Sequence, residues 1–162
     1  NTKVEFGREA QTILEKYVEK DNKDIKINEE VKSSIRSLKY KLMKDNAWNQ
    51  SDHKEAEEEY MRFLTLRMIH PQAELAPSKL IDIVWHAHIL NTEAYHQDCD
   101  RLFGKYLHHV PHLEEKQSDK NAESFEYTQS LFPLIFDRQM ISSTAARCEG
   151  KACHAPSDCR CR

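Results

Sequence analysis

The sequence predicts an all-α protein: a bundle of five to six helices followed by an irregular, cysteine-rich C-terminal tail. The 162 residues include only 3 Gly and 5 Pro, the two residue types that most disfavour helix interiors. Charged residues make up 31% of the chain and cluster in Glu- and Lys-rich segments typical of helices. Apolar residues recur at helical spacing in successive segments. We therefore expect a helical domain over residues 1–141 and a separate tail over residues 142–162.

The first two expected helices lie in the N-terminal third of the chain. The first covers residues 4–20, and its apolar face is formed by Ala10, Ile13, Leu14, Tyr17 and Val18. The polar run DNKDIKI interrupts this pattern, and Asn28 then offers a good N-cap to a second helix. Glu29 and Glu30 in its first turn complement the helix dipole. Its apolar stripe consists of Val31, Ile35, Leu38 and Leu42.

Two further helices are expected in the middle of the chain. A third helix starts near Asp52, after the loop NAWNQSD, and ends before Pro71. Its inward-facing residues are Ala56, Tyr60, Phe63 and Leu64. The acidic run EAEEE near its start is interpreted as a solvated face rather than a binding patch. Ser78 then caps a fourth helix through KLIDIVWHAHIL.

A fifth helix is expected from about Thr92 to Tyr106, with Gly104 marking its end. The sequence also allows the fourth and fifth helices to be one helix kinked near Asn91. The stripe of the fifth helix holds Tyr95, Cys99, Leu102, Phe103 and Tyr106. The run HHVPHLEEKQSDKNAES is expected to be irregular. A last helix carries Phe125, Thr128, Phe132 and Phe136, with a kink at Pro133.

Charge and hydropathy exclude two classes of partner. The net charge of −3 gives no overall attraction to nucleic acid or to anionic membranes, and no basic surface with interleaved aromatic residues stands out. No apolar run approaches the roughly 18 residues that a membrane span requires. We therefore expect neither a nucleic-acid partner nor a membrane span. A cytoplasmic location is favoured, although the tail would also suit an oxidising compartment.

Histidines gather in the second half of the expected domain. Asp82 and His86 are four residues apart, so they share one face of a helix, where a carboxylate can bind the same metal ion or orient the imidazole. His86 and His88 are two residues apart, about 200° around a regular helix, so they reach one ion only if the helix breaks there. Count and spacing support a metal site and a structural polar network equally.

The run IDIVWHAHILNTEAYHQDCDRLFGKYLHHVP resembles the glycine-rich domain-containing protein-like family, whose members share a Trp-His-x-His motif. The matching positions are Asp82, Trp85, His86, His88, Ile89, Leu90, Thr92, Tyr95, Cys99, Phe103, Gly104, His109 and Pro111. The likeness extends loosely through YTQSLFPLIF, whereas the tail has almost none of the glycine common in that family. The resemblance implies a mostly helical domain but no ligand set, so a metal assignment rests on the residues themselves.

From these residues we expect a helical metal-binding protein. The expected ligands are His86, His88 and His109, with Asp82 and Cys99 as further candidates. Imidazole ligands favour zinc, copper or iron over magnesium or calcium. An open position on the ion would allow it to activate water or bind O₂, with Tyr95 as a candidate acid beside it. The alternative is a non-enzymatic helical module that binds a protein or peptide, with structural histidines and a disulfide-clasped tail.

The tail, CEGKACHAPSDCRCR, is a second candidate site. Its candidate metal ligands or disulfide partners are Cys148, Cys153, His154, Cys159 and Cys161. Thiolates with one imidazole suit Zn²⁺ or Cu⁺, whereas an oxidising setting would favour two disulfides. The tail could also be a substrate, a Cys-rich peptide that its own or another domain modifies.

Overall fold

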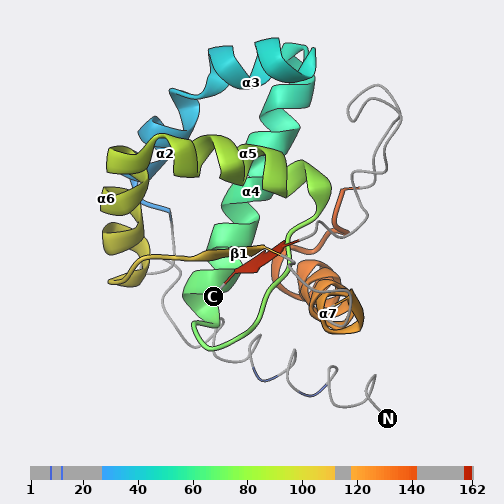
Figure 1. The fold of residues 1–162 in the computed structure, drawn as a ribbon. Helices are drawn as coiled ribbons and strands as arrows, with labels where there is room; N and C mark the ends of the chain where they lie inside the picture. Colours follow the sequence, from blue (N-terminus) through green and yellow to red (C-terminus); the bar gives the residue numbers. More distant parts are fainter. Residues whose placement is uncertain (1–7, 9–11, 13–26, 112–117, 142–158, 162) are drawn as a thin grey trace.

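The computed structural model confirms a mostly helical protein (Figure 1). It describes residues 8, 12, 27–111, 118–141 and 159–161. The elements, labelled as in Figure 1, are α2 (Glu29–Arg36), α3 (Lys39–Asn46), α4 (Gln50–Ile69), α5 (Lys79–Leu90), α6 (Thr92–Phe103), β1 (His109–Pro111), α7 (Ser118–Phe136) and β2 (Cys159–Cys161). Apart from Arg8 and Thr12, the helix expected over residues 4–20 lies outside the described residues.

Side-chain caps fix where three of the helices begin. Asn28 accepts hydrogen bonds from two backbone N–H groups in the first turn of α2, as the sequence predicts. Asn49 and Asp52 form a capping box, so α4 begins at Gln50, slightly before the expected start. Ser78 accepts from the backbone N–H of Ile81 and starts α5.

The single helix expected after Asn28 is divided into α2 and α3. Ser37 donates a hydrogen bond from its hydroxyl to the backbone oxygen of Ser34, and the Leu38 N–H bonds to Ile35 three residues back instead of four. The chain therefore makes one tight turn of the 3₁₀ kind between α2 and α3. The apolar stripe of the expected helix continues across this turn.

Asn91 settles the question of one helix or two. It ends α5 and precedes α6 with ψ of 67°, outside the helical region, so the two helices are separate. Gly104 ends α6 with a positive φ of 67°, which glycine adopts without steric cost. The fifth helix therefore stops at Phe103, where Gly104 marks its end, and does not reach Tyr106.

α7 is longer than the sequence predicts, because it begins at Ser118 inside the run expected to be irregular. Its first turns bury Asn121 and Ser124, and polar residues on an inward face carry no apolar signal. Pro133 lies within α7, and the helix continues to Phe136.

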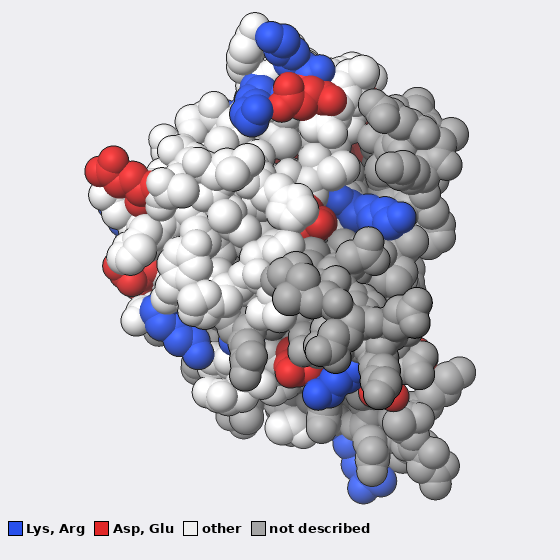
Figure 2. All heavy atoms as spheres, viewed as in Figure 1, with Lys and Arg blue, Asp and Glu red and all other residues white. Residues whose placement is uncertain are grey.

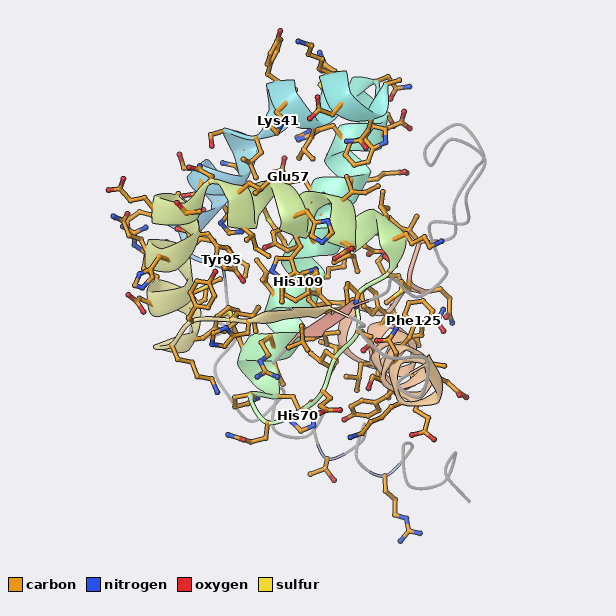
Figure 3. All side chains as sticks on the ribbon, viewed as in Figure 1. Lys41, Glu57, His70, Tyr95, His109 and Phe125 are labelled. Carbon is orange, nitrogen blue, oxygen red and sulfur yellow. The ribbon has the colours of Figure 1, made fainter. Side chains whose placement is uncertain are left out.

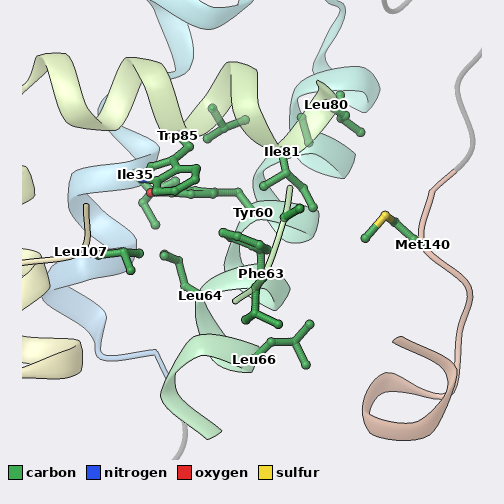
Figure 4. Packing of buried hydrophobic residues seen from close by; sticks show 14 of the residues in the cluster. Ile35, Tyr60, Phe63, Leu64, Leu66, Leu80, Ile81, Trp85, Leu107 and Met140 are labelled. Carbon is green, nitrogen blue, oxygen red and sulfur yellow. The ribbon is translucent and has the colours of Figure 1, made fainter. Parts of the chain in front are cut away.

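The core lies around α4, and α5 packs across it (Figure 4). Trp85 of α5 contacts Phe63 of α4 with a ring-centroid distance of 5.6 Å, and both side chains are fully buried. The region after α4 is joined to α7 by a bond from the Ala76 N–H to the Thr128 hydroxyl. Because α5 is anchored along this face, its opposite face is free to carry polar side chains.

Two short strands complete the described structure. β1 and β2 pair antiparallel and lie beneath α5 in Figure 1. The partners are His109 with Cys161, Val110 with Arg160, and Pro111 with Cys159. The end of the tail is therefore joined to the segment that follows α6, a long-range contact that the sequence does not predict.

Charged side chains of both signs are interspersed over the described part of the face in Figure 2. Among the described helices, none has the length and apolar character needed to cross a bilayer.

Candidate metal centre

The first two side chains of the candidate site come from one turn of α5. Asp82 and His86 are four residues apart, so both project from the polar face of the helix. The His86 side chain is 54% exposed and the Asp82 side chain 13% exposed. His86 Nε2 lies 3.4 Å from Asp82 Oδ2, which confirms the shared face expected from their spacing.

His109 of β1 brings a third side chain to the same point. Its Nε2 lies 2.8 Å from Asp82 Oδ1 and 2.9 Å from His86 Nε2. The ring of Trp85 packs against the His109 ring at a centroid distance of 4.4 Å and holds it under α5. Figure 3 shows His109 between α5 and the short ladder.

Asp82, His86 and His109 form a group whose ligand atoms all lie within 4.8 Å of one another. A neutral imidazole nitrogen either donates its hydrogen or accepts through its lone pair, and an ionised carboxylate only accepts. His109 Nε2 lies against both Asp82 Oδ1 and His86 Nε2, but an imidazole nitrogen offers either one hydrogen or one lone pair, in one direction, so it cannot make a well-aligned hydrogen bond to both. No single arrangement of hydrogens therefore makes all three contacts good hydrogen bonds.

His88 lies apart from this group. Its side chain is buried, and its Nδ1 and Nε2 atoms lie 2.7 Å from the Tyr60 hydroxyl and 2.8 Å from Asp98 Oδ2. Burial lowers the pKa of His88, and it raises the pKa of Tyr60 well above its usual value. A neutral His88 that donates to Asp98 and accepts from Tyr60 satisfies both contacts. The structure thus separates His88 from His86, because α5 is a regular helix at both positions.

Cys99 is also apart from the group. It is buried, and its Sγ accepts a 3.5 Å hydrogen bond from the Leu107 N–H. Burial is the main cause that raises the pKa of the Cys99 thiol. Packing at the junction of α6 with the following segment accounts for this residue, as the apolar stripe of α6 predicts.

Tyr95, the candidate acid, holds the same junction together. Its hydroxyl accepts a 3.0 Å hydrogen bond from Trp85 Nε1 and donates to the backbone oxygen of Leu107 at 2.5 Å. Burial raises the pKa of Tyr95, so the hydroxyl keeps its proton and continues to donate. This hydroxyl is therefore committed to Trp85 and Leu107 rather than to the three-residue group.

Sequence reasoning missed Tyr60 and Asp98 as partners of His88. Tyr60 is correctly expected to point inward, but its hydroxyl gives no sign of its partner. Asp98 is a fully buried carboxylate beside Cys99. The one signal in the sequence was its place next to Cys99 and three residues after Tyr95, on the inward face of the expected helix, because a buried acid is rare unless it is paired.

The tail candidates are only partly described. Cys148, Cys153 and His154 lie outside the described residues. Cys159 and Cys161 lie in β2, and Cys161 is the register partner of His109.

A family model described as UCP032817-like matches residues 13–143. The chain belongs to this family. The assignment to the glycine-rich domain-containing protein-like family, made from the Trp-His-x-His residues, is therefore wrong. The matched span includes Asp82, His86 and His109 and ends before Cys159 and Cys161.

No curated protein matches the chain. No solved structure matches it either. The description of the UCP032817-like family names no activity, substrate or cofactor, so functional reasoning for this chain depends on the geometry of its own side chains.

Proposed function

We propose that this protein binds a transition-metal ion through Asp82, His86 and His109. The observation that carries the proposal is the convergence of two imidazole nitrogens and one carboxylate oxygen within 4.8 Å, with contacts that no arrangement of hydrogens satisfies. A cation placed among the three atoms would turn each unfavourable lone-pair contact into a ligand bond.

The spacing of the three atoms suits a small ion. Two ligands on a tetrahedral zinc ion lie about 3.3 Å apart, given metal–ligand bonds of about 2.0–2.1 Å. The corresponding separations here are 2.8, 2.9 and 3.4 Å, so an ion requires shifts of only a few tenths of an ångström. The exposed His86 ring can make these shifts, whereas Trp85 holds the His109 ring in place.

The chemistry of the ligands favours zinc, copper or iron, because imidazoles are poor ligands for magnesium and calcium. His88 and Cys99 are not part of the proposed ligand set, since their polar atoms already have buried partners. Three protein ligands leave a fourth position on a tetrahedral ion. The occupant of that position decides whether the ion is structural or able to bind a substrate.

The test is elemental analysis of the full chain, purified without an affinity tag, beside a His86→Ala variant and a matched His96→Ala variant. The His96 side chain is exposed on α6 and lies 3.6 Å from Asp100, outside the three-residue group, so its loss leaves that group intact. We expect about one transition-metal ion per chain in the wild type and in His96→Ala, and loss of that ion in His86→Ala.

Two results would contradict this proposal. Metal that remains at the same stoichiometry in a His86→Ala/His109→Ala double variant would place the ion elsewhere in the chain. A wild-type protein that takes up no zinc, copper or iron after reconstitution would favour the alternative of a non-enzymatic interaction module with structural histidines.

A further inference from the structure

A groove lies where the end of α2 and the start of α3 meet the first turns of α4. Its volume is about 530 Å³, and all of its lining residues are polar or charged. Its cationic side chains are those of Arg36, Lys39 and Lys54, and its one acidic side chain is that of Glu57. This α3–α4 groove shares no residue with the candidate metal centre.

His53 is the residue of this groove that calls for a partner. Its side chain is 5% exposed, and its Nε2 atom is buried without a hydrogen-bond partner in the described part of the chain. Glu57 Oε2 lies 3.6 Å from this atom, which is too far for a hydrogen bond. Buried polar atoms are nearly always satisfied in native proteins, so His53 indicates that a further polar group reaches this point.

Glu57 does not occupy the cations of the groove firmly. Its Oε1 atom lies 3.7 Å from Nε of Arg36, whose side chain is 60% exposed. This contact and the one to His53 are both longer than a hydrogen bond, so the carboxyl can move aside at little cost. Burial is the main cause that raises the pKa of Glu57, so this carboxyl takes up a proton more readily than an exposed one when an anion approaches.

The start of α4 adds a second feature that favours an anion. Gln50 and Ser51, the first two residues of this helix, line the groove. The N–H groups of a first helical turn have no acceptor within the helix, and the positive end of the helix dipole attracts negative charge. The cap uses the Asp52 N–H, which donates to the Asn49 side chain, so it does not compete for the N–H groups of Gln50 and Ser51.

We propose that the α3–α4 groove binds the phosphate group of a small phosphorylated molecule such as a sugar phosphate. Three cationic side chains against one carboxylate leave two positive charges in excess. That excess matches a phosphate monoester, which carries about −1.5 to −2 at pH 7, better than it matches a carboxylate. Ligand pockets typically have volumes of about 300–1,000 Å³, so the groove has room for a small organic group beside the phosphate. Its polar lining favours a hydroxyl-rich group over an apolar one.

The phosphate would lie beside Arg36 in place of the Glu57 carboxyl. The exposed Arg36 guanidinium can turn to donate two parallel hydrogen bonds to phosphate oxygens, while Lys39 and Lys54 add point charges. His53 Nε2 would donate to a third oxygen after a small movement of Glu57. The long contacts of the groove are then replaced by charge-assisted hydrogen bonds.

The experiment is an NMR titration of the full-length protein with inorganic phosphate, glucose 6-phosphate and glucose, at constant pH and ionic strength. The readout is the ring resonances of His53, assigned by their loss in His53→Gln, and the internal control is the exposed His96 of α6. We expect saturable shifts of the His53 resonances with inorganic phosphate, tighter binding of glucose 6-phosphate and no response to glucose. The His96 resonances should not move.

Lys39→Gln and Lys41→Gln form a matched pair of variants on α3. Lys41 is 59% exposed, pairs with Asp45 and does not line the groove. Lys39→Gln should weaken phosphate binding about tenfold, because it removes a charged donor from the groove. Lys41→Gln should bind phosphate as the wild type does. Circular dichroism checks that each variant keeps its helices.

Three results would overturn the inference. The first is the absence of a His53 response to both inorganic phosphate and glucose 6-phosphate. The second is equal weakening in Lys39→Gln and Lys41→Gln, which would indicate a general effect of charge. The third is loss of the His53 response in His86→Ala, which would place the phosphate at the metal centre. Failure of the protein to bind a metal ion would leave the groove standing, because the two sites share no residue.

Discussion

His88 Nε2 and Asp98 Oδ2 lie 2.8 Å apart, and both side chains are 1% exposed. This contact joins α5 to α6 inside the core, and Tyr60 extends it to α4 through the other nitrogen of the same ring. A histidine two residues from the candidate metal ligand His86 therefore performs a different task, which is to tie three helices together.

Asp98→Ala should destabilise the protein by about 3 kcal/mol, because it leaves the buried His88 N–H without an acceptor. Arg101 and Ser34 also lose an oxygen to which they donate. The measurement is the free energy of unfolding from urea titration followed by circular dichroism. Asp100→Ala is the control, since the Asp100 side chain is 60% exposed and should cost less than about 0.5 kcal/mol. Equal losses in the two variants would contradict a buried network.

Substitutions of His86 and His88 should have different effects: one should abolish metal binding, and the other should lower the stability of the protein. His88→Ala leaves the Tyr60 hydroxyl and Asp98 Oδ2 without their partner and should cost about 3 kcal/mol, yet the folded protein should still bind zinc at the proposed site. His86→Ala removes a half-exposed side chain and should cost little in the absence of metal. Zinc at 100 times its dissociation constant should stabilise the wild type and His88→Ala by about 2.7 kcal/mol, and His86→Ala should show no such gain.

The measurement for these two variants is thermal unfolding with zinc and with a chelator. A zinc-dependent rise in the unfolding temperature that survives in His86→Ala and is lost in His88→Ala would reverse the assignment of the two histidines.

Tyr95→Phe should cost about 1–3 kcal/mol, because the lost hydroxyl leaves the Trp85 N–H and the Leu107 oxygen buried without their partner. The environment of Trp85 should change with it, so tryptophan fluorescence should report a shift in the native spectrum. Tyr106→Phe is the matched control, since Tyr106 is among the exposed large side chains. An unchanged free energy of unfolding in Tyr95→Phe would show that the junction does not depend on this hydroxyl.

Glu59→Gln should change how stability depends on pH. Glu59 of α4 is fully buried and accepts a 2.6 Å hydrogen bond from the Ile141 N–H, and burial is the main cause that raises its pKa. A carboxyl with a raised pKa in the folded state holds its proton more tightly there than in the unfolded chain. Its contribution to stability is therefore largest below pH 4.5 and is lost as the pH rises through the folded-state pKa.

The amide introduced by Glu59→Gln carries no titratable proton. The free energy of unfolding of this variant minus that of the wild type should therefore be more positive at pH 7 than at pH 4.5. Urea titrations at the two pH values measure it. Glu58→Gln is the control, because Glu59 remains in place and the wild-type change with pH should persist. If the free energy of unfolding of Glu59→Gln minus that of the wild type becomes more negative as the pH rises from 4.5 to 7, the role of burial is contradicted.

Much of the fold follows from short-range patterns. The caps at Asn28 and Ser78, the end of α4 before Pro71 and the end of α6 at Gly104 were all predictable, because each depends on residues within one helical turn. The division between α2 and α3 was not, because the apolar stripe runs through it without interruption.

Of the candidate site, the sequence by itself determined that Asp82 and His86 share a face, since four residues make about one turn of a helix. It could not select His109 over His88 as their neighbour. His109 lies 23 residues from His86, and its position depends on Trp85 packing and on the short ladder. Only the tertiary structure decided these contacts, because the side chains that meet across such distances depend on how whole helices and strands pack.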